Sequence, residues 1–132
     1  MLGHHLMLEK LLNTFEKNLG KNFNLMSQSF DELKLGLEKH FLLEEQEIFK
    51  HYNSKRKSNL KAIERLVYEH DKMLDQINKI KNDLAVKDII DLSEFKKELL
   101  KHRYFEEDYF YPRLEKEMTD REKRKIIEKL VK

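Results

Sequence analysis

Apolar residues recur at every third or fourth position along most of the chain, which is the spacing of one buried face of an α-helix. Residues 59–84 give the clearest example, with Ile63, Leu66, Met73 and Ile77 on one stripe. Similar stripes run through the other long segments. Together they predict four long helices and a short C-terminal helix, at about 2–19, 24–49, 59–84, 91–114 and 119–132.

The segments between the stripes are short and polar, as Gly20-Lys21-Asn22 and residues 53–58 show. Long amphipathic helices with short connections typically form an antiparallel bundle. Three Gly and one Pro are too few for the many turns of an all-β fold. At 132 residues the chain has the length of one domain. We therefore predict an all-α single domain over residues 1–132, an antiparallel up-down four-helix bundle with a short C-terminal fifth helix.

Six polar side chains take apolar positions in these stripes. They are His5 in the first stripe, His40 and Glu44 in the second, His70 in the third, and His102 and Glu106 in the fourth. A buried carboxylate is costly unless it is paired or binds a metal ion. Residues i and i+4 lie one above the other on a helix, so each His-x-x-x-Glu pair can chelate. The pattern therefore indicates a shared cation in the core. His4 is the alternative to His5, which the register of the first stripe favours.

These residues belong to an internal repeat. Residues 40–49 (HFLLEEQEIF) match residues 102–111 (HRYFEEDYFY), and residues 5–12 more loosely match residues 70–77. The chain is therefore predicted to consist of two helical hairpins, each with one single His and one His-x-x-x-Glu pair. Two such hairpins, packed with pseudo-twofold symmetry, would place a two-metal site at their centre.

Two His-x-x-x-Glu-Glu motifs, followed by Ile48-Phe49 and by Phe110-Tyr111, flank an interposed Glu69-His70. In these features the chain resembles the hemerythrin-like, HHE cation-binding family over nearly its whole length. The resemblance implies a four-helix bundle around two iron ions with an oxo or hydroxo bridge. It also implies a ligand set of His5, His40, Glu44, His70, His102 and Glu106, with Glu44 and Glu106 bridging. In oxygen-carrying hemerythrins the last carboxylate has the position of Glu107, but the His40–Glu44 spacing favours Glu106.

Oxygen-carrying hemerythrins also have a further His at the position of Leu74. Two iron ions offer about 12 coordination positions, of which the implied ligands and a bridging oxygen species fill about ten. The remaining positions are open to an outside ligand unless Glu9, Glu47, Tyr109 or water fills one. Carboxylate and imidazole ligands also suit manganese and zinc, so the sequence leaves the metal open.

The expected function is the binding of dioxygen, or a related diatomic or peroxide ligand, at the metal centre. Glu45, Glu69 and Glu107 are candidates to orient the imidazole rings. An oxygen or iron sensor would use the C-terminal helix to dock on a protein partner. The alternative is a di-iron oxidoreductase acting on peroxide, oxygen or nitrogen oxides. A metal- and oxygen-binding protein is favoured over an enzyme because the sequence shows no substrate pocket beyond the site.

Composition narrows the function classes further. Lys plus Arg is 27 and Asp plus Glu is 25, and this net charge of +2 argues against a nucleic-acid binder. There is no Cys, which removes disulfides, thiolate metal sites and Cys nucleophiles. No apolar run approaches the roughly 20 residues that cross a membrane, and no secretory signal pattern is present. We expect a cytoplasmic protein that does not contact membranes.

Overall fold

The computed structural model describes the backbone of residues 2–50, 57–86 and 90–130. All regular elements in these ranges are helical, which confirms the prediction of an all-α chain. In chain order they are α1 (Leu2–Asn18), α2 (Phe23–Leu43), the π-helix η1 (Glu44–Phe49), α3 (Lys57–Ala85), α4 (Ser93–Phe105), the π-helix η2 (Glu106–Phe110), α5 (Tyr111–Glu117) and α6 (Asp120–Leu130). Among the described residues, no helix combines the length and the apolar character that a membrane span needs.

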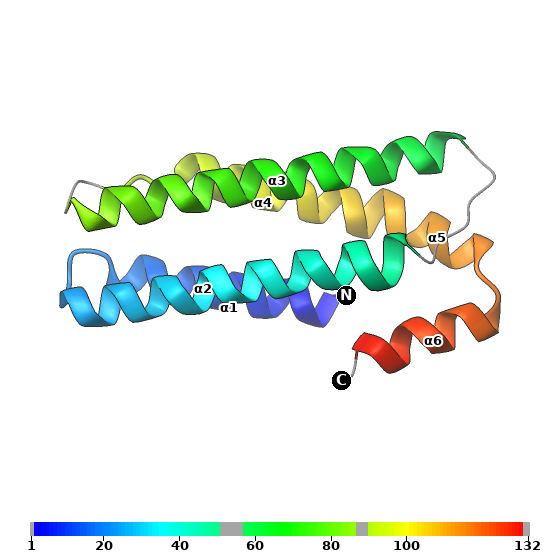
Figure 1. The fold of residues 1–132 in the computed structure, drawn as a ribbon, viewed down its shortest axis with the longest axis horizontal. Coiled ribbons are helices and arrows are strands. Elements are labelled where there is room, and N and C mark those ends of the chain that lie inside the picture. Colours follow the sequence, from blue (N-terminus) through cyan, green and yellow to red (C-terminus); the bar gives the residue numbers. More distant parts are fainter. Residues whose placement is uncertain (1, 51–56, 87–89, 131–132) are drawn as a thin grey trace.

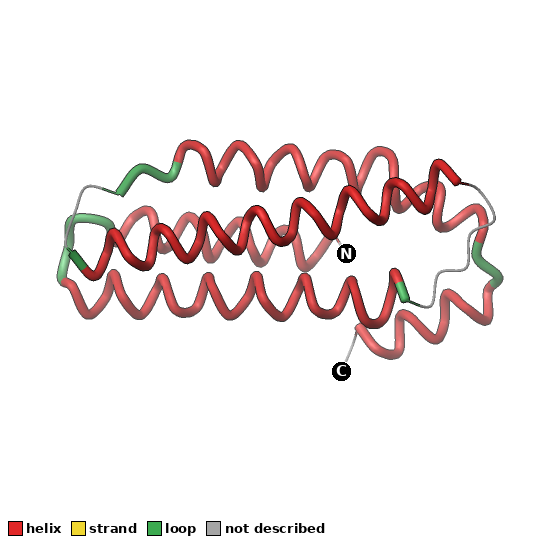
Figure 2. The backbone as a smooth tube through the Cα atoms, turned by 45° about the horizontal axis from the view of Figure 1, so that its top comes forward, coloured by secondary structure: helices red, strands yellow, loops and turns green. Residues whose placement is uncertain are grey.

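Helices α1 to α4 lie lengthwise beside one another, and the chain reverses direction from each to the next (Figures 1 and 2). Helix α5 follows η2, and α6 turns back to contact η1. The short C-terminal helix expected from residues 119–132 is α6. Of the residues on its apolar stripe, Ile127 is 58% exposed, whereas the side chains of residues 126, 130 and 131 lie outside the described part.

The apolar stripes form two separate clusters of buried side chains. The larger cluster lies along α1 to α4 and includes Phe15 and Met73. The smaller cluster lies around η1, η2, α5 and the first half of α3, and it includes Leu66 and Phe110. In α3, His70 lies between Leu66 of one cluster and Met73 of the other. The polar residues singled out in the sequence therefore form a layer between two apolar clusters.

The fourth apolar stripe corresponds to three consecutive elements, α4, η2 and α5, rather than to one α-helix. Pro112 is the second residue of α5, a position near a helix start where its missing N–H is tolerated. At the start of α6, the Glu122 N–H donates to Thr119 Oγ1 at 3.2 Å and the Glu122 carboxylate accepts from the Thr119 hydroxyl at 3.0 Å. This capping box fixes where the last helix begins.

Gly36 allows α1 to pack closely against α2. A Cβ atom at this position would lie 2.7 Å from Leu11 Cδ1, so any larger residue would require the end of the Leu11 side chain to move. The glycine costs helix propensity of about 1 kcal/mol, and close packing of the two helices offsets this cost. Helix α1 approaches α2 more closely than it approaches α4.

Candidate metal centre

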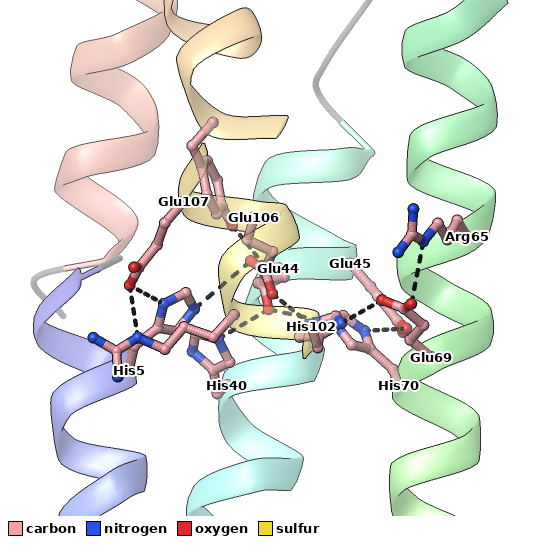
Figure 3. A network of polar contacts seen from close by, with 12 residues as sticks. His5, His40, Glu44, Glu45, Arg65, Glu69, His70, His102, Glu106 and Glu107 are labelled. Atoms are coloured by element: carbon pink, nitrogen blue, oxygen red, sulfur yellow. Dashed lines mark hydrogen bonds and ion pairs between the residues drawn. The ribbon is translucent and has the colours of Figure 1, made fainter. Parts of the chain in front are cut away.

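All six predicted site residues come together in the polar layer, each from a different element (Figure 3). They are His5 of α1, His40 of α2, Glu44 of η1, His70 of α3, His102 of α4 and Glu106 of η2. Each is buried, with at most 4% of its surface exposed. Residues more than 100 positions apart in the sequence thus meet in one place, as the pseudo-twofold repeat predicts.

Each His-x-x-x-Glu motif runs into a π-helix, which the apolar periodicity did not predict. Glu44 is the first residue of η1, and Glu106 is the first residue of η2. A π-helix holds more residues per turn than an α-helix, and such segments occur frequently at functional sites. In η1 the wider turn allows two adjacent residues, Ile48 and Phe49, to be buried together.

Each carboxylate contacts one imidazole from either half of the chain. Glu44 Oε1 lies 2.9 Å from Nε2 of His40 and 3.4 Å from Nε2 of His70. Glu106 contacts Nε2 of His102, and its other oxygen lies 3.8 Å from Nε2 of His5. The two carboxylates therefore lie at the centre of the layer, and the imidazoles surround them.

The ligand atoms form two groups that share one carboxylate. One group is Glu44, His70, His102 and Glu106, and the other is His5, His40 and Glu106, with ligand atoms within 4.8 Å of one another in each. Nε2 of His5, His70 and His102 and both oxygens of Glu106 are buried without a hydrogen bond from any described residue. Buried polar atoms are normally satisfied, and imidazole nitrogens and carboxylate oxygens bind divalent cations. The donor set therefore fits two cations.

The second ring nitrogen of three imidazoles is held by an acidic side chain. Nδ1 of His5 lies 2.8 Å from Glu107 Oε1, and Nδ1 of His70 lies 3.0 Å from Glu45 Oε1. Nδ1 of His102 lies 2.9 Å from Glu69 Oε1. A carboxylate accepts only from an N–H, so each ring carries a proton on Nδ1, and Nε2 is the nitrogen that faces the centre and is left for a cation. The expectation that these three acids orient imidazoles is confirmed.

Two arginines hold two of the three orienting acids in turn, and Figure 3 labels one of them, Arg65. Arg65 Nε donates to Glu69 at 3.2 Å, and Arg103 Nε donates to Glu107 at 3.1 Å. Burial opposes ionisation of Glu69 and Glu107, but their His and Arg partners outweigh it and lower the pKa of each carboxyl. Both acids therefore remain ionised, which makes them steady hydrogen-bond acceptors for the imidazoles.

The same contacts shift the pKa values at the centre of the layer. Burial alone would lower the pKa of His102, but the nearby carboxylates of Glu106 and Glu69 outweigh burial and raise that pKa to about 9. Burial would raise the pKa of Glu44, yet its close contacts with Glu106, His40 and His70 hold it well below its ordinary value. The metal-free protein therefore binds protons that a cation must displace.

Tyr111 is a further residue of this layer. The tyrosine that the sequence offered as a candidate near the metals was Tyr109 instead. The Tyr111 hydroxyl donates to Glu44 Oε2 at 2.6 Å. Burial and the negative charges of Glu44 and Glu106 raise the pKa of Tyr111 well above 10, so the hydroxyl keeps its proton. Tyr109 instead stacks on Phe105, with ring centroids 5.0 Å apart. The internal repeat aligns Tyr111 with Phe49, and this alignment was the signal in the sequence for a role of Tyr111.

The family comparison agrees with this geometry. The family model of the hemerythrin HHE cation-binding domain matches residues 1–91, which is more than two thirds of the chain. The chain belongs to this family. Comparisons with curated proteins and with solved structures give no match. The resemblance noted in the sequence is thus confirmed, and membership in a cation-binding family accords with the donor set.

The family match ends before the second His-x-x-x-Glu motif, so the hemerythrin model itself covers four of the six donors. The structure brings His102 and Glu106 to the other four. Glu106 faces the imidazole Nε2 atoms, whereas Glu107 binds Nδ1 of His5. His5 is the first-helix residue in the layer, and the side chain of His4 lies outside the described part.

Proposed function

We propose that the chain is a single hemerythrin-like domain over residues 1–132, an antiparallel up-down four-helix bundle with a short terminal helix. Its function is to hold two iron ions in the polar layer and to bind dioxygen or a related small ligand there. The observation that carries this proposal is the pair of donor groups with Glu106 in common, because a shared carboxylate is what a two-metal site requires.

The donor groups suggest a role for each residue. His70 and His102 belong to one ion, His5 and His40 to the other, and Glu106 and Glu44 lie between the two sets. When bound, the iron pair supplies the redox chemistry that binding of dioxygen needs. The protein's own contribution is to orient the imidazoles through Glu45, Glu69 and Glu107 and to exclude bulk water with the apolar clusters on both sides.

Anaerobic reconstitution with ferrous iron tests the proposal. Elemental analysis should give about two iron ions per chain, the number that the two donor groups support. Exposure to air should then produce the near-ultraviolet absorption typical of an oxidised iron pair. Parallel loading with manganese and zinc tests whether iron is preferred. A protein that retains no metal after gel filtration, and whose melting temperature does not respond to chelator, would contradict a metal-binding function.

The same preparation separates carrier, sensor and enzyme. A stable and reversible spectral change with dioxygen supports ligand binding. Turnover of peroxide, oxygen or nitric oxide with an added electron donor supports an oxidoreductase instead. A sensor acting through α6 should lose its partner, but none of its iron, when residues 119–132 are deleted.

A further inference from the structure

A cavity of about 320 Å³ opens between α1 and α4 and ends at the metal centre. Its inner end is formed by the imidazoles of His5, His40 and His102. Its walls include Leu8, Leu12 and Leu99, each at most 8% exposed. From His5 to Leu12 the wall of α1 extends about 10 Å at the rise of an α-helix. The cavity is therefore an apolar groove that runs from the surface to the imidazole rings of the metal centre, whose Nε2 atoms lie buried just beyond it.

The repeat explains why the groove lies on this side of the molecule. In the first half, Phe41 stacks on His70 of α3, with ring centroids 4.1 Å apart. The aligned residue of the second half is Arg103 of α4, and its side chain pairs with Glu9 and Glu107. No aromatic ring from α4 therefore stacks on His5 as Phe41 stacks on His70, and the groove takes this space. Gly36 contributes to the groove as well, because it allows α1 to lie close to α2.

Two ion pairs join α1 to α4 along the groove and leave the space between them open. Arg103 pairs with Glu9 near the metal centre, and Lys96 donates to both carboxylate oxygens of Glu16, at 3.0 Å each, near the outer end. Both cations at the rim thus already have carboxylate partners. An anionic group of a ligand would therefore gain little electrostatic stabilisation at the rim of the groove. The inner end is then the part of the groove where a negative charge can be stabilised.

The size of the groove exceeds what dioxygen needs. A water molecule occupies about 30 Å³ in the liquid, and an apolar cavity of about 150 Å³ holds a benzene molecule. The groove, at about 320 Å³, reaches the lower limit of small-molecule binding sites. Its walls are apolar and its inner end is formed by imidazole rings of the metal centre, so it suits an organic molecule with an apolar body and one polar end.

We propose that this groove binds a small monocarboxylate, with its carboxylate at the metal centre and its apolar body along Leu8, Leu12 and Leu99. The inference rests on the proposed function, because the metal pair supplies the positive charge. Divalent ions bring more positive charge than Glu44 and Glu106 cancel, and the imidazoles are neutral when they bind metal. Arg65 and Arg103 offset the ionised Glu69 and Glu107 beside the imidazoles. The centre thus attracts an anion, and the groove selects one with an apolar chain.

Calorimetric titration of the anaerobic ferrous protein with acetate, butanoate, hexanoate and octanoate tests this proposal. Affinity should rise about fourfold for each added methylene, the factor expected for burial of one CH₂ group, until the groove is filled. 1-Hexanol, which has the chain but no charge, should bind at least about tenfold more weakly than hexanoate. A flat series of affinities, or equal affinities of hexanol and hexanoate, would overturn the proposal.

Variants locate the binding in the groove. Leu12→Phe places a larger side chain in the wall and should weaken octanoate binding by about tenfold or more, while acetate binding stays the same. Asn13→Trp covers the mouth from an exposed position, and Thr14→Trp is its matched control, because Thr14 is also exposed but does not line the groove. Thermal unfolding checks that each variant folds. Octanoate affinity that is unchanged in both Leu12→Phe and Asn13→Trp would place the binding elsewhere and refute the inference.

Metal analysis of the same samples separates the two levels of the argument. Two iron ions per chain with no dependence of affinity on chain length would leave the proposed function intact and remove the groove ligand. Absence of iron after reconstitution would remove both, since the carboxylate would have no metal to bind. Azide, which is anionic and has no apolar chain, should bind equally well to the wild type and to Leu12→Phe.

Discussion

The two helical hairpins supply the same donors to the centre but exchange the residues that orient them. Glu107 of the second hairpin holds His5 of the first, and Glu45 of the first holds His70 of the second. Neither hairpin can therefore orient its own single His, and the site needs both hairpins in place. The exchange explains why a repeat of this kind brings its donor side chains together where the two hairpins meet.

The hairpins differ in three aligned positions close to the centre. The second hairpin has Arg103 where the first has Phe41, and it has Tyr111 where the first has Phe49. It also has Glu69 directly before its single His, whereas His4 has this place in the first hairpin. Tyr111 donates a hydrogen bond to Glu44 that the aligned Phe49 has no hydroxyl to make, and Glu69 accepts one from His102. The surroundings of the donors thus differ chemically between the hairpins, and three predictions test this difference.

The largest expected effect follows from the difference between the two carboxylates. Glu106 belongs to both donor groups, whereas Glu44 belongs to one. Glu106→Gln should reduce the iron content from about two ions to less than one. The reason is that loss of a ligand should weaken iron affinity by more than the roughly 100-fold that removal of an outer partner causes. Glu44→Gln should retain more iron. Asp108→Asn is the control, because Asp108 is an exposed acid of the same π-helix. Full iron content in Glu106→Gln would refute the shared role of this carboxylate.

The positions of these donors could be predicted from the sequence because each breaks an apolar stripe. A carboxylate at the position of Glu44 or Glu106 is stable in a core only with a partner, so burial and chemistry together implied a metal. The π-helices could not be derived in this way, because helical periodicity alone does not show where a turn widens. Tyr111 was missed for the same reason, since the π-helix determines which residue after Glu106 reaches Glu44.

The second prediction concerns pH and the contact between His102 and Glu69. The pKa of His102 is raised from 6.5 to about 9 in the metal-free protein. Proton binding therefore stabilises the fold fully below about pH 6.5, and this stabilisation disappears as the pH rises through about 9. The free energy of unfolding, measured by urea titration with chelator present, should fall over this range. Metal affinity should rise over the same range, because the imidazoles lose their protons.

Glu69→Gln sharpens this prediction because it removes a carboxylate that the first hairpin lacks at the aligned position. His102 then has a neutral amide oxygen in place of one of the two carboxylates that raise its pKa, so the alkaline loss of stability should move to lower pH. Metal affinity should fall by about 10–100-fold, as expected for loss of an orienting carboxylate. Glu64→Gln, an exposed change on the same helix, should alter neither quantity. Stability of the metal-free wild type that increases between pH 6.5 and 9 would show that the sign is wrong.

The smallest expected effect comes from the hydroxyl of Tyr111. Tyr111→Phe keeps the ring but leaves Glu44 Oε2 without its donor, and a hydrogen bond to a charged group contributes about 1.5–3 kcal/mol. Urea unfolding of the metal-free protein should show a loss of this size. Tyr109→Phe is the matched control, since its ring packs on Phe105 and should cost less than about 0.5 kcal/mol. Tyr111→Phe also gives both hairpins a Phe at this position, so the Mössbauer signals of the two irons should become more alike. Equal stability of the two variants would mean that the hydroxyl does not distinguish the carboxylates, and the difference between the metal positions would then depend on Glu69.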